Sequence, residues 1–350
     1  MNERVSNIRK ILDNEGVDCL LIDSPYDVLY ILEINQSFNY VELNIVLLLS
    51  KDEIYLISNP LAVPFIKEFL PQRINLIEAE VSSFKKNHFR YIKEIREIIG
   101  SKKFKKIGLT SAQYIDISEN CVRMRNPIQL MAAVKDENEI ELLRKSSSIL
   151  KNVYSKLKDK ISEGIGEIEL RNIIDVELHK EGIERRAFPT KVAFGKKTSN
   201  LFPVSTMQTL NKGDIVLIDF GGVYKGYIAE MARTFVYGDA EAKYTEIYDI
   251  VSTIYKKVIE FLKPGVVASA VDTLVKDYLN EVGHIQYFYQ PLGESTGIIK
   301  GGITLAPGSN EILKQGMTFV IEPALYIPDW GGIKIKDTVL ITENGAITLT

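Results

Sequence analysis

Two carboxylates, Asp219 and Glu230, lie eleven residues apart in the stretch "VLIDFGGVYKGYIAEMARTF", residues 216–235. An apolar strand is expected to end at Asp219, to turn at Gly221 and Gly222, and to return to Glu230. Carboxylate oxygens are ligands that hard divalent cations take in proteins. The spacing of the pair therefore indicates one half of a metal site.

Two further glutamates and a lysine lie later in the chain, at positions 294, 322 and 336. Glu322 ends the apolar segment "FVIEP", a pattern typical of a strand whose last side chain points into a pocket. Glu294 in "GEST" fits either such a pocket or an exposed loop, and Lys336 lies in the segment "KIKDT". Glu294 and Glu322 could divide acid and base work if their surroundings separated their pKa values.

The elements that would position these residues form two consecutive blocks. The first contains a long helix from Asp136 to a stop at Gly164, a second helix closed by Gly182, and strands that include the stretch above. The second contains two helices, of which the first ends at Pro264, followed by alternating strands and turns. Because both blocks run helix, helix, strands, we expect two halves around a shared sheet, with the site at their junction.

The first part of the chain predicts a smaller α/β unit. An amphipathic helix is expected to stop at Gly16, and buried strands are expected at "VDCLLI", "NIVLLLS", "EIYLIS" and "KKIGLT", the middle two as a hairpin. The segment "VRMRNPIQL" around Pro127 lacks periodicity and is the predicted linker. We therefore predict an N-terminal domain over residues 1–127 and a C-terminal domain over residues 128–350.

Composition narrows the classes of protein. A net charge of −3 argues against nucleic acid as a partner, because binding to phosphates needs a basic face. The longest apolar runs are too short to cross a bilayer, so no membrane partner is expected, and the N-terminus carries no apolar signal core. The chain has only two cysteines, Cys19 and Cys121, and Cys19 lies in an apolar run, which favours a reducing, cytoplasmic location.

The segments "FPTKVAFG", "DIVLIDFGGVYKGYIAEMARTF", "KPGV", "GMTFVIEP" and "GGIKIKDTVLIT" resemble, in order, those of the pita-bread metallopeptidases. These include methionine aminopeptidase, Xaa-Pro aminopeptidase, creatinase and Xaa-Pro dipeptidase (prolidase), and the prolidase branch is the most similar. The segment "GVDCLLIDSPYDVLYIL" is similar to the creatinase-type N-terminal domain. The resemblance covers essentially the whole chain and implies an α/β (α+β) fold whose pita-bread domain has two pseudo-two-fold halves.

In active members of this family two aspartates, a histidine and two glutamates hold two divalent cations, which activate a bridging water. By position, Asp219 matches the first aspartate, Glu230 the second and Glu322 the first glutamate. The family's "GHGIG" reads "GESTG" here, which places Glu294 at the histidine. Lys336 stands where the second bridging glutamate belongs.

Two other histidines of the family are replaced, one by Phe202 and one by Gly301. The chain has three histidines, His88, His179 and His284, and none aligns with a catalytic position. We expect His284, which follows a helix end, to have a capping or surface role.

Lys336 is the change with the largest chemical consequence. An ammonium has no lone pair to donate, and its charge repels dications. We therefore expect no metal cofactor, whether manganese, cobalt or zinc, and no intact catalytic residue. Without metals, Asp219, Glu230, Glu294 and Glu322 would crowd together, and some would take up protons unless Lys336 acted as the electrostatic centre.

Three functions remain open from the sequence. The first is a pseudoenzyme, binding or regulatory, whose acidic pocket around Lys336 favours a small cationic ligand or peptide. The second is a metal-free hydrolase of a small C–N compound, as creatinase is. The third is an atypical Xaa-Pro dipeptidase. The resemblance also implies a homodimer.

Overall fold

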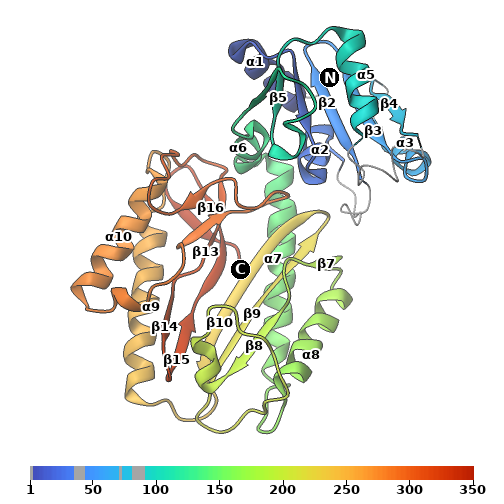
Figure 1. Cartoon of the computed structure of the whole chain (residues 1–350). Coiled ribbons are helices and arrows are strands. Elements are labelled where there is room, and N and C mark those ends of the chain that lie inside the picture. Colours follow the sequence, from blue (N-terminus) through green and yellow to red (C-terminus); the bar gives the residue numbers. More distant parts are fainter. Residues whose placement is uncertain (1–2, 35–43, 71–72, 81–90) are drawn as a thin grey trace. The chain divides into compact units, whose positions relative to one another are not determined.

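A computed structural model describes residues 3–34, 44–70, 73–80 and 91–350 of the chain (Figure 1). The chain divides into two compact units, Met1–Ala132 and Ala133–Thr350. The division falls five residues after the boundary placed at residue 127, because the predicted linker is folded. Its residues form strand β6 (Cys121–Arg123) and helix α6 (Pro127–Ala133).

The N-terminal unit is a six-stranded sheet with helices. Strands β1 (Cys19–Ile22), β2 (Val46–Ser50), β3 (Ile54–Ser58), β4 (Asn75–Glu78), β5 (Ile107–Leu109) and β6 lie in the order β4-β3-β2-β1-β5-β6. Its remaining described helices are α1 (Glu3–Glu15), α2 (Pro25–Leu32), α3 (Val63–Lys67), α5 (Ile92–Lys102) and the short 3₁₀-helix η2 (Ala112–Tyr114). The predicted opening helix and the β2–β3 hairpin are both present.

The C-terminal unit repeats one order of elements twice. The first half comprises α7 (Glu137–Leu157), α8 (Glu167–Lys180), β7 (Arg185–Arg186), β8 (Lys191–Phe194), η3 (Gly195–Ser199), β9 (Ile215–Tyr224) and β10 (Tyr227–Val236). The second comprises α9 (Ala242–Phe261), α10 (Ala268–Glu281), η4 (Ile285–Tyr287), β11 (Gly293–Ser295), β12 (Thr304–Leu305), β13 (Thr318–Ile321), β14 (Ala324–Ile327), β15 (Gly331–Lys334), β16 (Lys336–Ile341) and β17 (Ala346–Thr348). The two predicted helix, helix, strands blocks are confirmed.

One nine-stranded sheet joins the two halves. Its main path runs β12-β11-β13-β16-β10-β9-β7, with β8 also paired to β9 and β17 to β16. The two halves therefore meet where β10 pairs with β16, at Ala232↔Lys336 and Met231↔Asp337.

The turn predicted at Gly221 and Gly222 is wrong. Strand β9 continues through both glycines, and the hairpin turns at Lys225 and Gly226, which have positive φ angles of 46° and 85°. A Cβ at Gly221 would lie 3.0 Å from the ring of Phe188, and one at Gly222 would lie 2.8 Å from the side chain of Ile183. The glycines serve close packing on the two faces of the strand.

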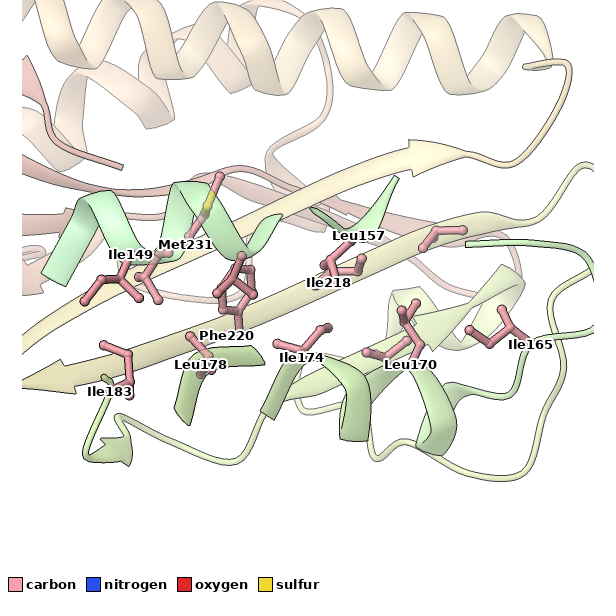
Figure 2. Close-up of a cluster of buried hydrophobic side chains, with 14 of the residues drawn as sticks. Ile149, Leu157, Ile165, Leu170, Ile174, Leu178, Ile183, Ile218, Phe220 and Met231 are labelled. Carbon is pink, nitrogen blue, oxygen red and sulfur yellow. The ribbon is translucent and has the colours of Figure 1, made fainter. Parts of the chain in front are cut away.

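Alternation along the strands separates the core from the site. The side chains of β9 and β10 that face helices α7 and α8 form a buried apolar cluster (Figure 2). It includes Ile218, Phe220 and Met231 from the strands and Leu157 and Ile174 from the helices. Because successive side chains point to opposite faces, Asp219 and Glu230 lie on the other face of the sheet. Among the described residues no helix is long and apolar enough to cross a bilayer.

Candidate functional site

Strand register places charged residues in one row across four strands. Lys191 of β8 pairs with Asp219 of β9, Asp219 pairs with Ala232 of β10, and Ala232 pairs with Lys336 of β16. Residues paired in this way share a face of the sheet. The small side chain of Ala232 lies between Asp219 and Lys336, so the longer groups on either side can meet above it.

A second row brings the remaining carboxylates to the same face. Glu230 lies two residues before Ala232 on β10, and its backbone N–H donates to Thr338 Oγ1 at 2.9 Å. Glu294 of β11 pairs with Val320 of β13, which pairs with Thr338. Glu322, two residues after Val320, follows on the same side.

Lys336 lies among three of the predicted carboxylates. Its Nζ is 2.9 Å from Asp219 Oδ1, 3.2 Å from Glu230 Oε2 and 3.3 Å from Glu322 Oε2. Lys336 is 4% exposed, Asp219 1% and Glu230 0%. The structure therefore brings these four residues together, with the ammonium between the carboxylates.

A second buried ammonium, from Lys334, was not predicted. Its Nζ lies 2.6 Å from Glu322 Oε2 and 3.2 Å from Asp219 Oδ2, and Thr234 Oγ1 bonds both its backbone N–H and its carbonyl. The sequence did carry a signal for it. Lys334 and Lys336 are two residues apart in "KIKDT", the spacing that puts side chains on one face of an extended chain.

Two more lysines complete the cluster. Lys300 Nζ lies 2.5 Å from Glu230 Oε1 and 3.2 Å from Glu294 Oε1, so Glu294 is a site residue rather than a free loop glutamate. Lys191 Nζ lies 3.9 Å from Asp219 Oδ2. Lys300 is in a loop, and the pairing of Lys191 depends on the register between β8 and β9. Neither position could be read from local sequence.

We call these eight residues the lysine–carboxylate cluster: Lys191, Asp219, Glu230, Glu294, Lys300, Glu322, Lys334 and Lys336. Its four ammonium groups match its four carboxylates, so its formal net charge is zero. The acidic pocket expected from the sequence is therefore a charge-balanced cluster, because Lys191, Lys300 and Lys334 lie among the carboxylates together with Lys336.

The directions of the pKa shifts in the cluster agree with carboxylates and ammonium groups that are paired. Burial works to raise the pKa of Asp219, but the ammonium groups of Lys334 and Lys336 outweigh it and hold that pKa far below its usual range. The same opposition lowers the pKa of Glu322. Burial works to lower the pKa of Lys336, and Asp219, Glu230 and Glu322 outweigh it, so that pKa is raised. These lowered pKa values keep Asp219 and Glu322 ionised beside the ammonium groups of Lys334 and Lys336.

The Phe188 ring lies against three of the cluster's ammonium groups. Its centroid is 4.5 Å from Lys336 Nζ, 5.3 Å from Lys191 Nζ and 5.8 Å from Lys300 Nζ. The negative face of an aromatic ring attracts cations. Gly221 leaves the room that this ring needs beside β9.

The positions of the replaced histidines lie beside the cluster. Phe202 is 70% exposed, and its ring lies 5.5 Å from Lys191 Nζ. A Cβ at Gly301, where φ is +85°, would lie 3.0 Å from Glu294 Oε2.

The chain's own histidines are engaged elsewhere. Nδ1 of His179 pairs with the carbonyl of Ile183, and Nδ1 of His284 pairs with that of Val282, next to the end of α10. His88 lies outside the described residues.

The fold and the site place the chain in the pita-bread class of proteins. Its sheet is built from two repeated halves, and the carboxylates lie on the face opposite helices α7 and α8. The family model "Metallopeptidase family M24" matches residues 141–343, and the chain belongs to that family.

Similarity to individual proteins extends over the whole chain. An Xaa-Pro dipeptidase of Pyrococcus furiosus is 30% identical over 361 residues, covering 100% of this chain and 98% of that protein. A solved prolidase from the same organism matches with a TM-score of 0.85 and 28% identity over 98% of each chain. A prolidase structure from Pyrococcus horikoshii OT3 matches with a TM-score of 0.87 and 27% identity, covering 100% of this chain and 98% of that one.

Proposed function

We propose that this M24 protein is a pseudoenzyme, with a binding or regulatory role, in which lysines stand where active relatives place metal ions. One observation carries the proposal. Lys336 Nζ lies within 3.3 Å of Asp219, Glu230 and Glu322, the carboxylates that would have to turn to a metal.

The donor set does not fit two divalent cations. The implied metals need anionic oxygens and a nitrogen with a free lone pair, but the groups among these carboxylates are protonated amines that only donate. The raised pKa of Lys336 makes loss of its proton less favourable still. In the described part of the chain no group of three or more His, Cys, Asp or Glu is arranged so that it could hold a metal. The chemistry of these residues therefore does not support a reaction that runs through metals.

A second candidate, an atypical Xaa-Pro dipeptidase, is favoured by similarity over the full length to a protein of that name. A metal-free hydrolase is the third candidate, and its acid–base pair would have to come from the more exposed Glu294 and Glu322. If the protein is active, hydrolysis is the reaction that its relatives support. The homodimer and the cytoplasmic location stay predictions.

We expect purified protein to contain less than about 0.1 equivalent of manganese, cobalt or zinc after dialysis, and to leave Xaa-Pro dipeptides intact when these ions are added. The physical reason is that a dication would have to displace ammonium groups already paired with the carboxylates. Elemental analysis and a proline-release assay measure both quantities. The Pyrococcus furiosus Xaa-Pro dipeptidase, handled in parallel, is the positive control. Stoichiometric metal together with turnover would establish the dipeptidase instead.

The melting temperature with and without EDTA shows whether a bound metal stabilises the fold. Because the carboxylates are already neutralised by lysines, we expect EDTA to leave the melting temperature unchanged within about 1 °C, whereas loss of a bound ligand would lower it. A fall of several degrees that is reversed by one of these cations would contradict the proposal.

A further inference from the structure

Lys191 is held differently from the other lysines of the cluster. Its Nζ lies 3.9 Å from Asp219 Oδ2, beyond hydrogen-bond distance. Asp219 is already shared by Lys334 at 3.2 Å and Lys336 at 2.9 Å. Over the residues that the structure describes, Lys191 Nζ makes no hydrogen bond, so its three N–H donors have no protein acceptor.

Two aromatic rings flank this ammonium group. The centroid of Phe188 lies 5.3 Å from Lys191 Nζ, and that of Phe202 lies 5.5 Å away. Phe202 is 70% exposed, and the side chain of Lys191 is 22% exposed. An incoming molecule can therefore meet a cation and an exposed aromatic surface at one place.

The charge of Lys191 is also incompletely compensated. Burial lowers its pKa, and although Asp219 and Glu322 act to raise it, the ammonium groups of Lys334 and Lys336 oppose them, so the net shift is downward. An anion that accepted hydrogen bonds from Nζ would offset this desolvation.

We propose that Lys191, with Phe188 and Phe202, binds a small carboxylate that carries an apolar group. The carboxylate would accept from Nζ, and the apolar group would cover the exposed ring of Phe202. A monoanion suits the site better than a phosphate dianion, because the cluster's own carboxylates lie nearby. The inference rests on the proposed function, since it takes the cluster as lysine-filled. The proposed ligand is an anion, whereas the sequence predicted a small cationic ligand.

Three probes that share one apolar body and differ in charge test this site: 3-phenylpropionate, 3-phenylpropanol and 3-phenylpropylamine. Calorimetric titration of the full chain in EDTA at pH 7 is expected to show the carboxylate binding at least about tenfold more tightly than the alcohol, and the amine most weakly. Equal affinities, a preference for the amine, or no binding of the carboxylate at 10 mM would each overturn the proposal.

Matched variants locate the site. Lys191→Gln is expected to remove the preference for the carboxylate over the alcohol, whereas Lys196→Gln, which removes an exposed charge from η3, is expected to leave it unchanged. Phe202→Ala should weaken the carboxylate and the alcohol about equally, and it tests the site even if Lys191→Gln folds poorly. A preference that survives in a folded Lys191→Gln variant would refute the assignment. Metal content and proline release test the proposed function separately, so either result can fail alone.

Discussion

Replacement of Lys336 by methionine is expected to lower the free energy of unfolding of the C-terminal unit by about 3–5 kcal/mol. Removal of one partner from a buried ion pair leaves the other charges uncompensated, which is the costly change in such sites. Here Asp219, Glu230 and Glu322 would lose an ammonium group that contacts all three. Methionine keeps the length of the side chain, so lost packing contributes little.

The measurement is urea unfolding followed by tryptophan fluorescence. The chain has a single tryptophan, Trp330, between β14 and β15, so the signal reports the C-terminal unit alone. Lys212→Met is the matched control, because Lys212 is 69% exposed, lies 3.7 Å from Asp239, and should matter by less than about 1 kcal/mol. A Lys336→Met variant that unfolded at the wild-type urea concentration, or an equally stable Lys336→Glu variant without metal, would show that Lys336 does not centre the cluster.

The destabilisation by Lys336→Met is expected to shrink as the pH falls from 7 towards 4. In the wild type, the pKa values of Asp219 and Glu322 are lower in the folded state than in the unfolded state, where they are about 4. The stability that comes from this difference is fully present above the unfolded-state pKa values. It is lost as the pH falls through the folded-state pKa values. In the variant these pKa values lie higher, because burial still raises them and one ammonium group is missing. As the pH falls, Asp219 and Glu322 therefore take up protons in the variant before they do so in the wild type. The difference in free energy of unfolding between the two proteins becomes smaller.

The test is the same urea titration at pH 7, 6, 5 and 4. The difference in free energy of unfolding between the wild type and Lys336→Met should become smaller at each lower pH. The corresponding difference between the wild type and Lys212→Met should stay constant. A difference for Lys336→Met that is constant over this range would mean that the three carboxylates do not carry the effect.

The fold could be predicted from periodicity and from the resemblance, but details that depend on tertiary packing could not. Apolar spacing located the main helices of the C-terminal unit, as in α7 and α9. Gly221 and Gly222 predicted a turn, yet both lie within β9, because their missing side chains make room for Phe188 and Ile183. Local sequence cannot distinguish a glycine that turns the chain from one that admits a neighbour.

In the site, too, the residues in recognisable segments could be predicted, and those placed by tertiary packing could not. The anionic half of the cluster was predicted because each carboxylate lies in a recognisable segment, and Lys336 was predicted because it replaces one. Lys191 and Lys300 were not predicted, since a strand pairing and a loop place them there. Lys334 was missed although the alternation in "KIKDT" pointed to it. The cluster is therefore balanced in formal charge instead of acidic as predicted, and the structure brings the predicted carboxylates and Lys336 together.

The seam between β10 and β16 has a consequence for how the C-terminal unit unfolds. Lys334 and Lys336 belong to the second half of the sheet, and Asp219 and Glu230, their partners more than 100 residues away, belong to the first. If either half opened alone, buried charges on both sides would be stranded without partners. Partial unfolding along this seam is therefore disfavoured, and the charges couple the two halves into one cooperative unit.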